Sequence, residues 1–166
     1  MPFILGIVGK SDTGKTTLIL RLIPELIKRG YRVGAVKNCP HGFDMDREGK
    51  DSWKFCQKGS EAVLLTSPDK LSLIRRIDKE KEKDIPKLLS LFFYDLDIVL
   101  VEGFSKLREI KKIELLRKGI SEKMDPSLNE VIAVVSDVEI KTDKPLFKPD
   151  EIDKIVDFME KIIEKG

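Results

Sequence analysis

The chain has 166 residues, 31 of them basic and 29 acidic, so its formal net charge at pH 7 is +2. This length predicts one domain, 1–166, with a single core. The balanced charge gives no indication of a nucleic-acid surface. No apolar run is long enough to span a membrane, and the first one lacks the flanks of a signal peptide. We therefore expect a cytoplasmic protein without a membrane partner, and the two separated cysteines, Cys39 and Cys56, fit a reducing compartment.

The N-terminal region carries the strongest pattern in the chain. Residues 9–16 read Gly-Lys-Ser-Asp-Thr-Gly-Lys-Thr and match the phosphate-binding pattern G-x-x-x-x-G-K-[ST] at every fixed position. The apolar run 3–8 predicts a buried strand before this loop. Apolar residues at helical spacing over 16–29, followed by Gly30, predict a helix after it. A strand before and a helix after are the context that the pattern requires, so we predict a single P-loop nucleotide-binding domain.

The residue types of this loop explain its expected chemistry. Backbone N–H groups between the two glycines curl inward around phosphate oxygens, and the following helix adds its N-terminal dipole. Lys15 is expected to reach the β- and γ-phosphates, and the Thr16 hydroxyl is expected to bind Mg²⁺. The nucleotide-binding residues expected in the loop are Gly9, Lys10, Ser11, Asp12, Thr13, Gly14, Lys15 and Thr16.

Strands and helices alternate along the rest of the chain. Further strands are predicted at 32–37, 62–66, 71–74, 97–102 and 131–135. The segment 112–116 is predicted to be an edge strand, and helices are predicted at 51–58, 85–94 and 150–164. Because several strands are apolar on both faces, the fold class is α/β: a three-layer P-loop NTPase, with a mostly parallel sheet and helices on both faces.

Two carboxylates flank the apolar strand 97–102. Ligands of such sheets bind beyond the carboxyl ends of the strands, and the P-loop marks that edge. Glu102 ends its strand there, whereas Asp97 begins the strand, about 16 Å away at about 3.3 Å per residue. Glu102 is therefore the candidate to hold Mg²⁺, through water, or to orient an attacking water, and Asp97 is expected to be a surface or capping group. Glu102 and Lys15 are the candidate catalytic residues.

Other polar residues leave strands at the same edge. Lys37 ends the strand 32–37 and is expected to be a nucleotide-binding residue. We expect Asp44 or Asp46 in the following loop to touch the metal or nucleotide, with simple loop solvation as the alternative. The single histidine, His41, fits no standard zinc spacing. Asp137 follows the strand 131–135. Its two oxygens could accept both guanine N–H donors and favour GTP, although a turn-capping aspartate fits this position equally well.

Taken together, these segments resemble the molybdopterin-guanine dinucleotide biosynthesis protein B (MobB) family. The matching blocks are GIVGKSDTGKTTL at 6–18, RGYRVGAVK at 29–37, FDMDREGKDS at 43–52, DIVLVEGF at 97–104 and KKIELLR at 111–117. Only the first block is common to all P-loop proteins, and the third and fourth make the match specific. The chain departs from the family after Lys37, where Asn-Cys-Pro-His-Gly keeps one histidine of a histidine-rich segment.

The resemblance implies a small, usually dimeric GTP-binding protein with weak GTPase activity. Such a protein assists a separate molybdopterin guanylyltransferase, which attaches GMP to molybdopterin; we expect weak, transient contact with that enzyme and allow contact with the molybdopterin cofactor. Carried onto this chain, the resemblance implies that Gly14, Lys15, Thr16 and Thr17 bind phosphates and Mg²⁺. It places Asp46 and Glu102 on the metal side.

Two alternatives share the same P-loop. A small-molecule kinase would pass the γ-phosphate to a bound acceptor, but it normally needs an arginine-bearing lid, and Arg108 and Arg117 are too sparse for a clear one. A dimeric ATP-dependent switch would bind the nucleotide and a partner. Lys10 lies five residues before Lys15, like the extra lysine of the dimeric ATPases related to ParA and the nitrogenase iron protein, although an exposed loop lysine is the alternative. The two glycines that follow that lysine in those families are Ser11 and Asp12 here.

Overall fold

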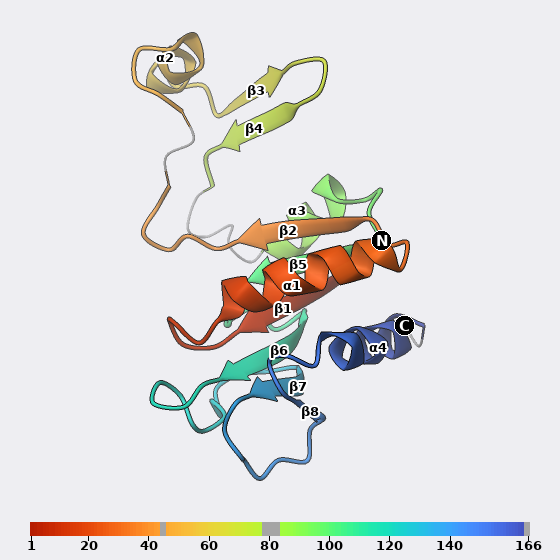
Figure 1. The fold of residues 1–166 in the computed structure, drawn as a ribbon. Helices are drawn as coiled ribbons and strands as arrows, with labels where there is room; N and C mark the ends of the chain where they lie inside the picture. The colour runs from red at the N-terminus through yellow and green to blue at the C-terminus, as the bar shows by residue number, and fades with distance from the viewer. Residues whose placement is uncertain (44–45, 78–83, 165–166) are drawn as a thin grey trace. The chain divides into compact units, whose positions relative to one another are not determined.

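The computed structural model of the protein describes residues 1–43, 46–77 and 84–164 (Figure 1). Contacts within the chain divide it into two compact units, one made of Met1–Asn38 with Pro86–Gly166 and the other of Cys39–Ile85. The larger unit carries the P-loop. The prediction of a single domain over 1–166 stays untested.

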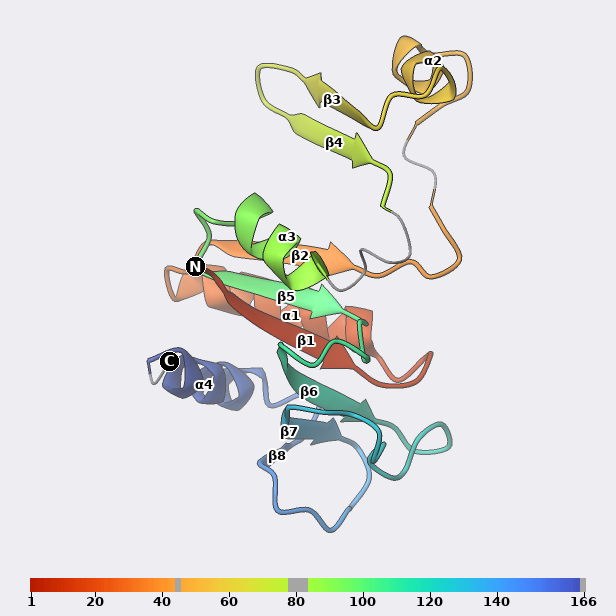
Figure 2. The same ribbon diagram turned by 180° about the vertical axis from the view of Figure 1, so that it is seen from behind.

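A six-stranded sheet forms the centre of the larger unit (Figures 1 and 2). Its strands are β1 (Phe3–Val8), β2 (Val33–Lys37), β5 (Ile98–Glu102), β6 (Lys111–Leu116), β7 (Val131–Ser136) and β8 (Leu146–Phe147). They are arranged in the order β2-β5-β1-β6-β7-β8, and every neighbouring pair is parallel. This confirms the predicted parallel sheet and brings the carboxyl ends of all its strands to one edge. The two-residue β8 was not predicted, because it is too short to carry a period.

Helices cover both faces of this sheet, as predicted (Figures 1 and 2). On one face lie α1 (Lys15–Lys28) and α4 (Ile152–Ile163), whose apolar sides pack into one core with β1, β5 and β6. On the other face lies α3 (Ile85–Phe92). Gly34 on β2 permits the close approach of the segment after α3, because a Cβ there would lie 2.9 Å from carbons of Phe93 and Leu96.

An arginine joins the two helices that share a face. Arg29, just after α1, donates to Asp157 at 2.6 Å and to Glu160 at 2.7 Å, both on α4, and to Glu25 at 3.0 Å. These hydrogen bonds, from Asp157 first, raise the pKa of Arg29 above its ordinary value. The network fixes the packing of α4 against α1, which begins at the P-loop.

The prediction that 112–116 is an edge strand is wrong. Strand β6 lies between β1 and β7 and is buried on both faces. Lys112 and Glu114 alternate with apolar residues, a pattern typical of a strand with one solvent-facing side, yet they are 0% and 2% exposed. The polar side is covered because Lys112 Nζ donates to the carbonyls of Leu107, Ile110 and Asn129, and Glu114 accepts from the Asp125 backbone.

The smaller unit contains α2 (Asp51–Gln57) and the hairpin of β3 (Ala62–Thr66) and β4 (Leu71–Arg75). The segment 71–74 is a strand as predicted, but these two strands form an antiparallel sheet of their own. The pairing of Leu64 with Leu73 and of Thr66 with Leu71 places all three leucines on one face of the hairpin. Leu64, Leu71 and Leu73 are 54%, 69% and 37% exposed, so this face of the smaller unit is an exposed apolar surface.

No helix among the described residues combines the length and the apolar composition needed to cross a lipid bilayer.

Candidate functional site

The P-loop joins β1 to α1 through backbone conformations that favour glycine. Gly9 has φ +145° and Gly14 has φ +96°. A Cβ on Gly9 would lie 2.6 Å from the carbonyl oxygen of Leu115, so no side chain fits there. Within the described part of the chain, no side chain caps the N-terminus of α1, and the first turn of this helix holds no acidic residue. The first N–H groups of α1 and the positive end of its dipole therefore favour an anion beyond Gly14.

Lys15 is held over the loop that precedes it. Its Nζ donates to the carbonyl oxygen of Lys10 at 2.6 Å, and the Thr13 hydroxyl donates to the same oxygen at 2.9 Å. The Lys15 side chain is exposed along this contact, so its ammonium group can reach a phosphate without leaving a buried site. The loop backbone and the lysine thus lie together, as the pattern predicts.

Three residues from different elements meet at the carboxyl ends of β2 and β5. The Thr16 hydroxyl donates to Glu102 Oε2 at 2.7 Å, and Lys37 Nζ lies 3.6 Å from Glu102 Oε1. Lys37 and Glu102 are register partners on adjacent strands, which explains the ion pair. The structure therefore confirms that Thr16 and Glu102 lie at one edge with the P-loop, while their roles stay predictions.

The donor atoms at this point fit Mg²⁺. A hydroxyl and a carboxylate oxygen are hard ligands, and Mg²⁺ in nucleotide sites takes most of its remaining ligands from water and phosphates. Within residues 1–43, 46–77 and 84–164, no group of three or more histidine, cysteine, aspartate or glutamate residues could hold a metal by itself. A site completed by phosphates remains compatible with that finding.

The loop aspartates are not placed against this site. Asp46 belongs to the smaller unit, where its Oδ1 accepts from the Arg47 backbone at 2.9 Å. Asp44 lies outside the described residues. The expectation that Asp46 binds the metal therefore stays a prediction.

A pocket of about 460 Å³ surrounds the meeting point of Thr16 and Glu102. Its lining residues are Ser11, Asp12, Gly14, Lys15, Thr16, Thr17, Lys37, Glu102 and Arg117. Lys15, Lys37 and Arg117 supply three cations against the two carboxylates of Asp12 and Glu102, a balance suited to phosphates.

Arg117 was considered in the sequence only as part of a lid. It directly follows β6, so it emerges beside β1 at the phosphate edge, and its Nη1 would lie 3.7 Å from a Cβ on Gly14. The signal that could have found it was the KKIELLR block. An edge strand would not place Arg117 beside β1, whereas the observed position of β6 between β1 and β7 does.

A smaller hollow of about 180 Å³ adjoins the P-loop on its β7 side. Its lining includes Thr17, Arg21, Arg117, Asp137 and Pro149. Asp137 Oδ1 accepts from the Lys118 backbone at 2.8 Å, so one of its oxygens holds the turn after β6. Asp137 thus caps this turn, as one of its two predicted roles requires, and base reading by its other oxygen stays a prediction.

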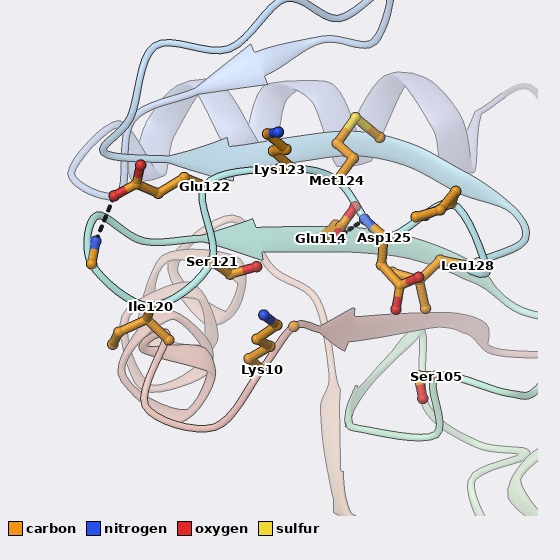
Figure 3. A pocket seen from close by; sticks show the side chains of 13 residues that line it. Lys10, Ser105, Glu114, Ile120, Ser121, Glu122, Lys123, Met124, Asp125 and Leu128 are labelled. Atoms are coloured by element: carbon orange, nitrogen blue, oxygen red, sulfur yellow. Dashed lines mark hydrogen bonds between the residues drawn. The ribbon is translucent and has the colours of Figure 1, made fainter.

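Two further predictions concern residues outside this pocket. Asp97 is a capping group, as predicted: it accepts from the Arg32 backbone at 2.7 Å and from the Arg32 guanidinium at 3.1 Å, and these bonds lower the pKa of Asp97. Lys10 does not line the phosphate pocket. Its side chain lines a different cavity, shown in Figure 3, so a nucleotide-binding role for the Lys10 side chain stays a prediction.

Comparison with known proteins places this site in a family. Residues 4–137 match the family model of MobB, described as molybdopterin guanine dinucleotide synthesis protein B. The chain belongs to the MobB family. It is 39% identical to the molybdopterin-guanine dinucleotide biosynthesis adapter protein of Haemophilus influenzae, over 95% of this chain and 87% of that protein. It is 36% identical to the adapter protein of the same name from Escherichia coli, over 98% and 94% of the two chains.

Solved MobB structures share the fold. A crystal structure of molybdopterin-guanine biosynthesis protein B superposes with a TM-score of 0.74 and 34% sequence identity, covering 98% of this chain and 99% of the other. The resemblance in the sequence is therefore confirmed along nearly the whole chain, including the P-loop and the VEGF block that ends at Phe104.

Proposed function

We propose that this MobB-family protein binds GTP with Mg²⁺ and acts as an accessory protein in converting molybdopterin cofactor to its guanine dinucleotide form. One observation carries the nucleotide part: the P-loop, whose Thr16 hydroxyl lies 2.7 Å from Glu102 in a pocket rich in cations. Membership of the MobB family supports the pathway. The names of the relatives from H. influenzae and E. coli support the description as an adapter.

Each residue of the pocket has a part in this proposal. The backbone of 9–14 and the first turn of α1 bind the phosphates, with Lys15 and Thr17 beside them. Thr16 and Glu102 hold Mg²⁺, with Asp46 as a further candidate, and the metal neutralises charge on the β- and γ-phosphates. Glu102 is already engaged by Thr16 and Lys37 and is poorly available as a base, so we expect turnover to be slow.

The preference for guanine rests on Asp137. It lies in the hollow that adjoins the P-loop, where Leu115, Leu116 and Val135 supply apolar surface for a base. The Oδ2 atom of Asp137 would accept an N–H of guanine while Oδ1 keeps the Lys118 turn. Adenine would instead bring its acceptor N1 toward this carboxylate, beside its single N6 donor group.

The proposal extends to assembly. We expect a homodimer in the cytoplasm that contacts a molybdopterin guanylyltransferase weakly and transiently. The near-zero net charge offers little long-range attraction to a partner. Support for self-association comes from the exposed leucine face of the β3–β4 hairpin.

Titration calorimetry and reconstitution test the proposal together. We expect GTP with Mg²⁺ to bind at least tenfold more tightly than ATP. In a reaction containing guanylyltransferase, molybdopterin and limiting GTP, adding the protein should raise the yield of guanine dinucleotide cofactor, and Lys15→Ala should not.

One result would replace this proposal with the kinase alternative. It is an unchanged yield at every GTP concentration, together with a screen that finds a phosphorylated small molecule. Among the described residues that line the phosphate pocket, Arg117 is the arginine that such an activity could use.

A further inference from the structure

A second cavity, of about 690 Å³, lies on the polar face of β6 (Figure 3). Ile113 and Leu115 point to the face covered by α1 and α4, so Glu114 between them points to the opposite face. The segment 119–128 forms the other walls, and Gly9 and Lys10 border the cavity where β1 ends. Its volume falls within the range of about 300–1,000 Å³ typical of small-molecule sites.

Glu114 is the feature of this cavity that points to a ligand. It is 2% exposed, and its Oε1 accepts from the Asp125 backbone at 2.8 Å. Its Oε2 is buried and has no hydrogen-bond partner among the described residues. Burial raises the pKa of Glu114. A buried polar oxygen is normally paired, so Oε2 calls for a donor from outside the protein.

The other carboxylates of the cavity already have partners. Glu122 accepts from the Gly119 backbone at 2.8 Å. Asp125 accepts from the Ser127 backbone at 2.9 Å and from its hydroxyl at 2.7 Å. Glu114 is therefore the acidic group of this lining, within the described part of the chain, that has a buried oxygen left for a ligand.

The remaining lining defines the shape and charge of such a ligand. Ile120, Met124 and Leu128 supply apolar surface, against which a flat ring can pack. Lys10 and Lys123 place two cations at the same cavity (Figure 3). A fitting molecule thus has a planar ring with N–H donors and carries an anionic substituent.

We propose that this cavity binds a 2-amino-4-oxopyrimidine ring of the pterin type, which donates an N–H to Glu114 Oε2 and directs its anionic side chain toward Lys10. Guanine contains the same ring unit. The hollow that adjoins the phosphate pocket and shares Gly14, Thr17 and Arg117 with it already offers a place for a nucleotide base. We therefore assign the cavity at Glu114 to a pterin rather than to the guanine base of the nucleotide. This inference deepens the proposed function and rests on it for the identity of the pterin.

Lys10 contacts both the Glu114 cavity and the P-loop. Its side chain lines the Glu114 cavity, while its carbonyl oxygen accepts from Lys15 and Thr13 of the P-loop. A pterin with its phosphate near Lys10 would lie on one side of the loop whose other side holds the nucleotide phosphates. An adapter built in this way holds both components of the dinucleotide.

The test uses the full chain and 6-carboxypterin, a fluorescent pterin with an anionic substituent, titrated by fluorescence and calorimetry. Glu114→Gln should weaken its binding at least tenfold. The matched control is Glu109→Gln, an exposed glutamate on the turn before the same strand, which should leave the affinity unchanged. GTP affinity, measured in parallel, should be the same in all three proteins, and GTP should not displace the pterin.

Several outcomes would overturn the proposal. One is 6-carboxypterin that does not bind, or that binds equally to wild type and Glu114→Gln. Another is competitive displacement by GTP with weaker GTP binding in Glu114→Gln, which would assign the cavity to the guanine base. If Glu114→Gln does not fold, Ser121→Phe, which fills the cavity from its wall, replaces it and should abolish pterin binding. Failure of GTP binding in the wild type would refute the proposed function separately.

Discussion

At the scale of single residues, the P-loop lysine is the group whose charge matters most for the nucleotide. Lys15 Nζ donates to the Lys10 carbonyl and is exposed along this contact. We expect Lys15→Ala to weaken GTP binding at least tenfold, because the ammonium no longer meets the phosphates, and to leave the melting temperature nearly unchanged. Calorimetry checks the first effect and thermal unfolding the second. Lys161→Ala, which removes an exposed lysine of α4, is the charge-matched control, and unchanged affinity in a folded Lys15→Ala protein would disprove the P-loop assignment.

Glu102 is expected to serve turnover more than binding. It lies at the end of β5, outside the phosphate cradle, and its two oxygens face Thr16 and Lys37. We expect Glu102→Gln to bind GTP within about threefold of wild type, a change of less than about 1 kcal/mol. Its slow hydrolysis should fall at least tenfold and lose its dependence on Mg²⁺. Phosphate release measured at several Mg²⁺ concentrations decides this, and wild-type rates in the variant would remove Glu102 from the reaction.

A substitution at Asp137 tests whether this residue recognises the guanine base. Because its Oδ1 accepts from the Lys118 backbone, Asp137→Asn keeps the turn if the amide oxygen takes that place. The amide nitrogen then faces the hollow and cannot accept an N–H from guanine. We expect a weaker preference for GTP over ITP and a relative gain for XTP, measured as competitive affinities. If the three nucleotides keep the wild-type order, Asp137 only holds the turn.

The sequence predicts the site residues whose positions depend only on the P-loop pattern and on the end of a strand. The P-loop pattern and the position of Glu102 placed Thr16, Lys15 and Glu102 at one edge, and the 2.7 Å contact agrees. Arg117 and Glu114 could not be found in the same way. Their places depend on which strands neighbour β6, and the order of parallel strands is set by long-range packing that no local period records.

At the scale of elements, β6 shows how polar residues can mislead. Its alternation of charged and apolar residues is typical of a strand with one solvent-exposed face. Here the segments around 107–110 and 125–129 bring backbone groups to Lys112 and Glu114, so both charged side chains are buried. The strand was predicted correctly but its burial was not, because loop backbone replaces water as the partner of its charged side chains.

Lys112 is therefore expected to stabilise the fold rather than to act in the site. Its Nζ donates to three backbone carbonyls, and the side chain is fully buried. We expect Lys112→Met to lower the free energy of unfolding by about 1–3 kcal/mol, since those carbonyls lose their donor. Urea unfolding measures this. Lys111→Met on the opposite side of the strand should change the stability by less than about 0.5 kcal/mol, and an equal loss in both variants would contradict the role of the buried bonds.

At the scale of the whole molecule, the larger unit was predictable because each strand–helix repeat carries its own pattern. The apolar runs at 3–8 and 97–102 and the apolar spacing of α1 agree with one architecture, a parallel sheet between helices. The smaller unit was less predictable. Its strands were found, but a two-stranded sheet with an open apolar face is rarely stable alone, so no local pattern separated these two strands from the main sheet.

The open face of that hairpin leads to the last prediction, which concerns assembly. Leu64, Leu71 and Leu73 lie on one face and are all at least 37% exposed. Contiguous apolar surface of this kind is typical of protein interfaces. We expect the wild type to be a dimer by light scattering. Leu71→Glu should convert it to a monomer at micromolar concentration, because burying the glutamate carboxylate in the interface would remove its hydration.

Leu91→Glu is the matched control, since Leu91 is an equally exposed leucine, 65% exposed, on α3 of the larger unit. It should remain a dimer and bind GTP like the wild type. GTP binding by the Leu71→Glu monomer then separates assembly from the site: unchanged affinity means that each chain carries a complete pocket. A dimer that survives Leu71→Glu would move the interface away from the hairpin, and a wild type that is monomeric at every concentration would refute the dimer itself.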